Sequence, residues 1–316
     1  MSRNWYFRLA IWIAALLLMA SALSAVFGYL IGPSILHPMN LNPEREVQTA
    51  AMLARTGATK QDFDVTAPDG VALKGWKVRA PQSTGDWVIV FHGISDNRTG
   101  NLGHAEFLLR NGYNVVMMDS RAHGHSGGLM ATYGWKERYD TVAITSALFA
   151  TERVHRLGAL GVSLGAAVAL QSAAVEPRIA AVVAEDPFAN LREVSYDYGG
   201  LDISPLLGET VFRPATIAAM RRVTELGGFS PDDVSPEKAV RSRAFPVLLI
   251  CGTRDHRIPC RHAEWIYEAA IGPKELWVVK GAGHASALGF DPQQYESRTI
   301  AFFQRYLGAP KSLFFD

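Results

Sequence analysis

The chain has 316 residues, of which 48% are hydrophobic and 19% are charged, and its 31 basic residues are balanced by 30 acidic ones. Because nucleic-acid binding needs lysine and arginine concentrated on one face, a balanced chain without a basic cluster excludes that class. Two cysteines are too few for a disulfide scaffold, and the apolar content is too high for a disordered chain. These proportions predict a large buried core and one membrane segment.

The membrane segment is at the N-terminus. Residues 9–43 contain no Asp, Glu, Lys or Arg, and residues 9–31 are almost continuously apolar. About 20 such residues span a bilayer as a helix. Arg3 and Arg8 precede the apolar run, so the positive-inside rule places the N-terminus in the cytoplasm and the rest of the chain on the exported side. We expect residues 1–43 to be an uncleaved anchor and linker.

The alternative to an anchor is a signal peptide that is cleaved at an A-x-A site formed by Ala20 and Ala22. Apolar character continues beyond that site through Val26, Phe27 and Ile31, whereas the apolar core of a signal peptide usually runs for about 7 to 15 residues. The anchor is therefore favoured, and both interpretations place the remainder of the chain on the exported side.

Two short elements are predicted between the anchor and the main sheet. The first is a helix with Asn42 as its N-cap, Pro43 in its first turn and Gly57 as its stop. The second is an antiparallel hairpin, because residues 63–67 and 71–77 alternate apolar and polar side chains around a Pro-Asp-Gly turn. The small apolar residues that we expect to pack the helix on the domain are Val47, Ala50, Ala51 and Ala54.

Six short, continuously apolar runs follow, separated by segments of helical length. Continuous apolarity indicates burial on both faces, as in a parallel sheet between two layers of helices. The runs are residues 87–91, 113–118, 156–160, 179–184, 247–251 and 276–279, and the expected helices are residues 103–110, 137–153, 164–175, 261–270 and 293–306. This alternation predicts one α/β domain over residues 44–316 with a doubly wound, mostly parallel, eight-stranded-type sheet.

Residues 187–245 interrupt this rhythm, because they contain no good strand. A structureless loop of that length is unusual in a compact domain, so the segment is predicted to be a helical cap inserted into the fold. It follows the carboxyl end of a predicted strand, and it therefore covers the sheet edge where α/β folds bind their ligands.

The sequence around Ser163 is typical of a nucleophile elbow. An apolar strand runs into Gly161-x-Ser163-x-Gly165 and then into an Ala-rich helix. In such an elbow the serine has strained backbone angles, and the residues two positions away must be tiny so that strand and helix can pack. The pentapeptide alone is a weak signal in a chain with 28 glycines. Its placement between a buried strand and a helix makes Ser163 the candidate nucleophile.

A serine nucleophile needs a base and an orienting carboxylate, which we expect downstream in the order acid, then histidine. Asp255 and His284 lie in turn-rich and Gly-rich loops just after the last two apolar runs. Because both loops end strands of the predicted parallel sheet, both side chains are expected at the same edge as Ser163. Glu185 and Asp186, which end another apolar run, are the alternatives for the acid.

The third requirement is a pair of backbone N–H groups for the oxyanion, often worth about 3 kcal/mol per donor. Leu164, directly after the nucleophile, is expected to supply one. Ile94 is expected to supply the other from the loop after residues 87–91, with Gly93 as the alternative. His92 is interpreted as a residue whose hydrogen bonds hold that loop.

Five sequence motifs, in this order, resemble those of the α/β-hydrolase superfamily. They are Val90-Phe91-His92-Gly93, Asp119-x-Arg121-x-x-Gly124-x-Ser126, Gly161-Val162-Ser163-Leu164-Gly165, Gly252-x-x-Asp255-x-x-Ile258-Pro259 and Gly283-His284. The likeness covers about residues 60–307 and is greatest to membrane-anchored esterases, monoacylglycerol-lipase-like enzymes and serine-aminopeptidase-like enzymes. It implies an α/β-hydrolase fold with Ser163, Asp255 and His284 as a catalytic triad.

The loop that contains His123 and His125 has a second interpretation. With Asp119 and His92 these histidines imitate a zinc site, but no further ligand falls at a matching spacing, so we expect no metal. In the superfamily this loop shapes the sheet edge and usually has glycine where this chain has Ala122.

Cys251 and Cys260 flank the loop that carries Asp255. In an exported domain they either form a disulfide that holds this loop or remain two small apolar side chains. The separation of their Cα atoms decides between these states, and the sequence leaves both open.

Together these features predict a membrane-tethered serine hydrolase that cleaves a carboxylic ester through an acyl-enzyme, without a metal or organic cofactor. The apolar residues of the cap and the membrane anchor favour an acyl or lipid-like substrate. The alternatives are a serine peptidase or amidase on the same fold, and a non-catalytic binding protein. The catalytic domain is expected on the periplasmic or extracellular side.

Overall fold

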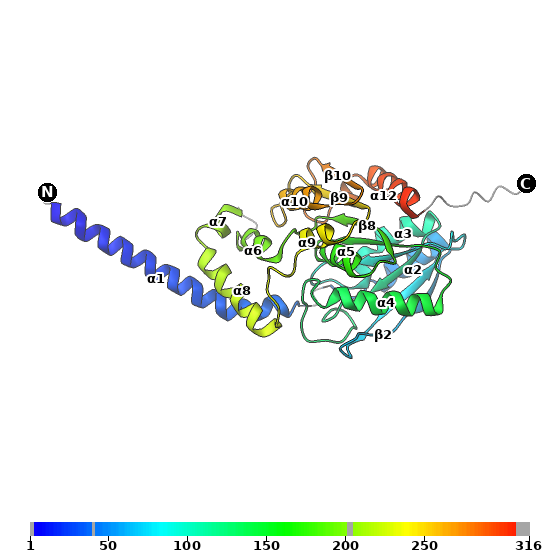
Figure 1. Cartoon of the computed structure of the whole chain (residues 1–316), viewed down its shortest axis with the longest axis horizontal. Coiled ribbons are helices and arrows are strands. Elements are labelled where there is room, and N and C mark those ends of the chain that lie inside the picture. Colours follow the sequence, from blue (N-terminus) through cyan, green and yellow to red (C-terminus); the bar gives the residue numbers. More distant parts are fainter. Residues whose placement is uncertain (1–2, 40–41, 201–204, 308–316) are drawn as a thin grey trace, which may run out of the picture.

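The computed structural model describes residues 3–39, 42–200 and 205–307 (Figure 1). The strands of its main sheet are β1 (Thr59–Asp62), β4 (Gly75–Arg79), β5 (Trp87–Phe91), β6 (Asn114–Met118), β7 (Leu157–Val162), β8 (Ile179–Glu185), β9 (Val247–Gly252) and β10 (Lys274–Val279). They form one eight-stranded sheet in the order β1-β4-β6-β5-β7-β8-β9-β10. The pairs that involve β4 are antiparallel and the others are parallel. The predicted doubly wound, mostly parallel sheet is confirmed.

Helices cover both faces of this sheet. They are α2 (Glu46–Thr56), the 3-10 helix η1 (Arg98–Asn101), α3 (Leu102–Arg110), α4 (Glu137–Thr151), α5 (Leu164–Val175), α10 (Arg261–Ala269), α11 (Ala287–Phe290) and α12 (Pro292–Leu307). The side chains of β5 alternate between two buried clusters: Trp87, Ile89 and Phe91 pack with α4, α5 and α10, and Val88 and Val90 pack with α3 and α12. Continuous apolarity in the central strands thus reflects burial on both faces.

The predicted hairpin before the main sheet is divided into two pairs. β2 (Val65–Thr66) and β3 (Ala72–Leu73) form a separate two-stranded sheet, whereas β1 pairs with β4. The division falls at Lys74, whose N–H donates to Ser126 Oγ at 2.9 Å and whose carbonyl accepts from the Asp119 N–H at 2.8 Å. A distant loop thus takes the hydrogen bonds that a continuous hairpin would use.

The helix that follows the N-terminal apolar segment begins later than predicted. α2 starts at Glu46, with Arg45 as its N-cap residue and no side-chain capping bond. The residues before it bond to a remote loop instead: the Asn42 carbonyl accepts from the Asn97 side chain at 2.8 Å, and the Arg45 N–H donates to Thr99 Oγ1 at 3.2 Å. The expected stop at Gly57 is confirmed, with φ of 66°. The predicted packing stripe is wrong: Val47 is 79% exposed, and the buried positions of the helix are instead Thr49 and Met52.

The segment between β8 and β9 is helical, as predicted for a cap. It contains α6 (Leu191–Gly199), α7 (Pro205–Glu209), α8 (Arg213–Gly227) and α9 (Pro236–Ser242). Residues 201–204 of the predicted cap lie outside the described residues. α6, α7 and α8 lie together beyond one end of the sheet, on the side from which the N-terminal helix projects (Figure 1).

That N-terminal helix, α1 (Arg3–Leu36), is long and apolar enough to cross a membrane. Its carboxyl end is fixed to the main domain. The Ala131 N–H donates to the Leu36 carbonyl at 2.8 Å, and the Tyr133 hydroxyl donates to the Ile35 carbonyl at 2.7 Å. Leu36 itself is fully buried. The helix is therefore continuous with the folded domain at this end.

The last turns of α1 also pack on α8 of the cap (Figure 1). Gly28 and Gly32 face α8: a Cβ on Gly28 would collide with the carbonyl of Ala215, and a Cβ on Gly32 would lie 2.7 Å from Arg222 Cβ. Two glycines spaced by four residues allow helices in an apolar environment to approach closely. α1 and the cap are consequently in direct contact.

Candidate active site

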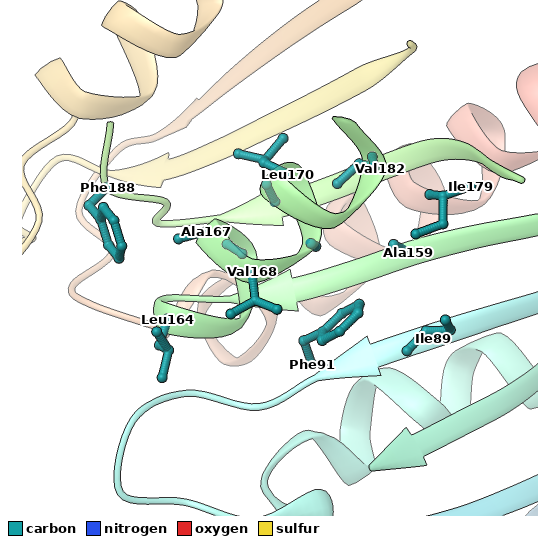
Figure 2. Close-up of a cluster of buried hydrophobic side chains, with 14 of the residues drawn as sticks. Ile89, Phe91, Ala159, Leu164, Ala167, Val168, Leu170, Ile179, Val182 and Phe188 are labelled. Carbon is teal, nitrogen blue, oxygen red and sulfur yellow. The ribbon is translucent and has the colours of Figure 1, made fainter. Parts of the chain in front are cut away.

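Ser163 occupies a sharp turn between β7 and α5. Its φ of 57° and ψ of −120° are strained for a residue with a side chain. A Cβ on Gly161 would collide with the Gly165 carbonyl, and a Cβ on Gly165 would collide with the carbonyl of Phe91. The start of α5 lies beside the end of β5 in this region (Figure 2). Only glycine therefore fits at positions 161 and 165, because a larger side chain would collide with the backbone.

Three side chains that the sequence singled out meet at this edge of the sheet. His284, in the loop after β10, places Nε2 at 2.8 Å from Ser163 Oγ and Nδ1 at 2.6 Å from Asp255 Oδ2. Asp255 follows β9, and its other oxygen accepts the backbone N–H groups of Arg257 and Ile258 at 2.8 and 2.9 Å. The acid is thus held on both of its oxygens.

The hydrogen bond to Asp255 determines where the proton of His284 resides. A carboxylate only accepts, so Nδ1 carries the proton and Nε2 is left to accept from the Ser163 hydroxyl. Burial alone would lower the pKa of His284, but the hydrogen bond and charge of Asp255, together with the charge of Asp186, raise that pKa above its ordinary value of 6.5. This arrangement suits a base that becomes cationic during a reaction.

Asp186 and Glu185, the alternative acids, do not bond to the imidazole. Asp186 Oδ2 is 4.0 Å from His284 Nδ1 and instead accepts the Ala285 N–H at 2.7 Å, while Oδ1 accepts the Gly252 N–H at 3.2 Å. Burial, reinforced by the charges of Glu185 and Asp255, raises the pKa of Asp186 to about 7. Asp186 therefore ties the loop that carries His284 to the end of β9.

The two expected oxyanion donors belong to residues that line the cavity at Ser163. Leu164 is the first residue of α5, and the first N–H groups of a helix have no partner within that helix. Ile94 follows β5, and both residues line the same cavity as Ser163. His92 holds the Ile94 loop: Nε2 accepts the Ser120 N–H at 3.0 Å, so Nδ1 donates to the carbonyl of Gly93 at 2.8 Å. Burial, with the neighbouring His123, lowers the pKa of His92 to about 4.

In the loop that resembled a zinc site, Asp119 and one nitrogen of His123 bond to backbone groups, and His123 Nε2 is buried without a hydrogen-bond partner among the described residues. Asp119 accepts from the backbone N–H groups of Arg98 and His125 at 2.7 and 2.9 Å, and His123 Nδ1 bonds to the carbonyl of Arg121. Ala122 has φ of 59°, which explains why glycine suits this position elsewhere in the superfamily.

Metal-type donors also converge at the triad itself. The ligand atoms of Asp186, Asp255 and His284 lie within 4.8 Å of one another. The same atoms make the hydrogen bonds described above, with backbone N–H groups on both carboxylates. The convergence of these three side chains is thus accounted for by the hydrogen bonds of Asp255 and His284 and of the loops around them.

Cys251 and Cys260 form a disulfide, with Cα atoms 5.4 Å apart. The sequence had left this pairing open. The bridge closes the segment that carries Asp255 and links the end of β9 to the residue just before α10. The loop of the acid is thereby constrained at both ends.

A cavity of about 640 Å³ extends from Ser163 between the main domain and the cap. Its walls come from α6 and α8 and, in addition, from α1 through Leu23, Phe27, Ile31 and Ile35. The sequence did not identify these α1 residues, because their side chains resemble any others in an apolar helix. Their regular spacing of four residues, next to the Gly28–Gly32 pair, could have indicated that they share one face of the helix.

The sheet order, the strained serine between β7 and α5, and the acid and histidine after β9 and β10 define an α/β-hydrolase. An esterase of Pyrococcus furiosus superposes with a TM-score of 0.70 at 27% identity, covering 87% of this chain and 99% of that one. An acylaminoacyl peptidase of Pyrococcus horikoshii shares the fold, with a TM-score of 0.60 at 17% identity over 82% of this chain and 43% of that one.

The family is narrower than the fold. The profile of the X-Pro dipeptidyl-peptidase (S15) family matches residues 34–226, and the chain belongs to that family. Among its relatives, YqkD of Bacillus subtilis is 31% identical over 77% of this chain and 79% of its own length. YfhR of Escherichia coli K12 is 29% identical over 72% of this chain and 74% of its own.

The glycine requirement at the elbow predicts a large loss of stability for Gly165→Ala. The added methyl collides with the backbone of Phe91, and overpacking of this kind costs about 1 to 3 kcal/mol. Gly289→Ala is the matched control, because a Cβ there meets no atom within 4 Å. Thermal unfolding in detergent measures both variants, and equal midpoints would contradict the steric account.

Proposed function

We propose that this protein is a serine hydrolase that cleaves carboxylic esters through an acyl-enzyme. The observation that carries the proposal is the continuous path from Ser163 Oγ through both nitrogens of His284 to Asp255, with separations of 2.8 and 2.6 Å. Separations of this size allow a proton to pass directly from nucleophile to base. Ser163, His284 and Asp255 are the proposed triad.

In the proposed reaction Ser163 Oγ attacks the ester carbonyl while His284 Nε2 takes the hydroxyl proton. The N–H groups of Leu164 and Ile94 stabilise the oxyanion. His284 then returns the proton to the departing alkoxide, which leaves as an alcohol. Water attacks the acyl-enzyme with His284 again as the base, and a carboxylic acid is released. Because His284 handles every proton transfer, the scheme calls for no metal or organic cofactor.

The cavity favours an ester with an apolar acyl group. Among the described residues, those that line it include no Asp, Glu, Lys or Arg. A substrate with a free amino terminus would bring an ammonium group into this site, and a buried charge needs a charged or well-placed polar partner. The esterase of Pyrococcus furiosus supports the same preference. An S15 peptidase activity is the second candidate, since the family profile is described by that reaction.

We infer that α1 tethers the hydrolase to a membrane, with residues 1–43 as anchor and linker, residues 44–316 as the catalytic domain and the N-terminus in the cytoplasm. Support comes from the length and apolarity of α1 and from Arg3 and Arg8 at its start. The disulfide between Cys251 and Cys260 supports an exported domain, because such bonds persist in oxidising compartments.

Covalent labelling tests the proposed nucleophile. A fluorophosphonate probe is expected to label the wild-type protein, and Ser163→Ala is expected to abolish labelling and to lower ester turnover by about 10⁴-fold or more without unfolding the chain. Ser146→Ala, at an exposed serine of α4, is the control. A wild-type protein that neither reacts with the probe nor cleaves any ester or aminoacyl amide would instead be a binding protein.

The pH dependence of kcat/KM follows from the raised pKa of His284. The base must be neutral, so activity is lost as the pH falls through that pKa and rises to a plateau above it. We expect the midpoint above the ordinary value of 6.5. Ester hydrolysis between about pH 5 and pH 8 measures it, with circular dichroism as a check of folding. A flat profile over this range would exclude His284 as the base.

Two matched substitutions separate the roles of the acids. Asp255→Asn removes the carboxylate bonded to His284 Nδ1 and should lower kcat by about 10⁴-fold. Asp186→Asn retains an oxygen that can accept a backbone N–H, so its loss should be much smaller. Steady-state kinetics with one ester decides between them, and a larger loss for Asp186→Asn would reassign the acid.

A further inference from the structure

The anchor helix forms part of the substrate cavity. Leu23, Phe27, Ile31 and Ile35 line it, and residues four apart lie on one face of a helix. At 1.5 Å per residue this face is about 18 Å long. One apolar wall therefore extends along α1 within the cavity that also contains Ser163.

The position of this wall is fixed by contacts on the adjacent face of α1. Gly28 and Gly32 pack on the backbone and side chains of α8. Between them, the Tyr29 hydroxyl donates to Glu225 Oε2 at 2.7 Å, and Arg222 donates to the same hydroxyl at 3.1 Å. α1 is consequently a structural part of the cap, in addition to being a membrane segment.

The depth of the wall follows from the length of the apolar run. About 20 residues cross a bilayer, and we place the crossing at residues 9–28, the first part of the apolar run after Arg8 and within the candidate span Trp5–Leu36. Tyr29, with its charged partners Arg222 and Glu225, then marks the membrane–water boundary, where tyrosine is enriched. In the proposed span, Leu23 and Phe27 are at the depth of the bilayer, and Ile31 and Ile35 are outside it. The wall runs from the lipid into the protein.

The cap has exposed apolar side chains near the same boundary. Leu206, Val211 and Ile217 are 64%, 62% and 48% exposed, and they belong to α7, to the turn after it and to the first half of α8. Ala215, which contacts Gly28, lies in the same part of α8. This end of the cap is thus placed to contact lipid together with α1.

We propose that the substrate is a long-chain acyl ester resident in the membrane, and that its chain reaches Ser163 from the bilayer along the Leu23–Ile35 face of α1. This inference rests on the proposed esterase function and adds the source and path of the substrate. A chain that moves from lipid into an apolar cavity exchanges one apolar environment for another, so it is never exposed to water. α1 is then a substrate-binding element.

The test compares two alkyl fluorophosphonates, one hexadecyl and one ethyl, with the full-length protein in phosphatidylcholine vesicles. The ratio of their labelling rates at Ser163 is the readout. In Ile31→Trp the indole narrows the cavity and is expected to lower the ratio of hexadecyl to ethyl labelling by about tenfold. Leu30→Trp, at a neighbouring position that is 70% exposed and does not line the cavity, is expected to leave the ratio unchanged.

Different results contradict different conclusions. If neither probe labels the wild-type protein, the proposed hydrolase function fails. If both probes label it and the ratio is the same in Ile31→Trp as in the wild type, the path along α1 is overturned while the function stands. Phe27→Trp, one turn earlier on the same face, replaces Ile31→Trp if that variant does not fold. Partition of the probes into the vesicles is the same for every variant, so it does not affect the comparison.

A second measurement identifies the source of the substrate. A long-chain fluorogenic ester that does not exchange between vesicles is placed either in the vesicles that hold the protein or in separate ones. We expect hydrolysis only when ester and protein share a bilayer. Equal hydrolysis in both arrangements would show that the ester arrives through water and would overturn the proposal.

Discussion

The close approach of α5 to the end of β5 is the constraint on which the active edge of this protein depends. Gly165 lies so near the carbonyl of Phe91 that no side chain fits, and Gly161 is equally restricted by Gly165. Only this approach allows the chain to reverse at Ser163 in a left-handed conformation and to present its hydroxyl to His284. The strain at one residue is maintained by packing on both sides of it.

The central strands could be predicted from the sequence because a strand buried on both faces has a continuous run of apolar residues. The division of the first hairpin at Lys74 and the late start of α2 could not. In both places the chain makes hydrogen bonds to remote groups, Ser126 and Asn97, which no local pattern contains. The outward orientation of Val47 follows from packing instead, since the burial of Met52 selects the other face of α2.

At the candidate site, chain order and strand ends were enough to select Ser163, Asp255 and His284, because parallel strands bring their carboxyl ends to one edge. Local sequence left Asp255 and Asp186 as competing acids; hydrogen-bond geometry separates them, since only Asp255 bonds to the imidazole. The contribution of α1 to the cavity was beyond sequence reasoning for another reason. The same apolar residue types occur where a helix faces lipid and where it faces a cavity, so residue type does not distinguish the two.

The double attachment of α1 has a mechanical consequence. α1 is held at Leu36 by the main domain and at Gly28 and Gly32 by the cap. These contacts prevent α1 from rotating relative to the domain. With the proposed membrane attachment, this rigid connection would hold the catalytic domain in one orientation relative to the bilayer and keep Ser163 at a constant height above it. A flexible linker of disordered chain would behave differently, because it would let the catalytic domain reorient freely relative to its attachment point.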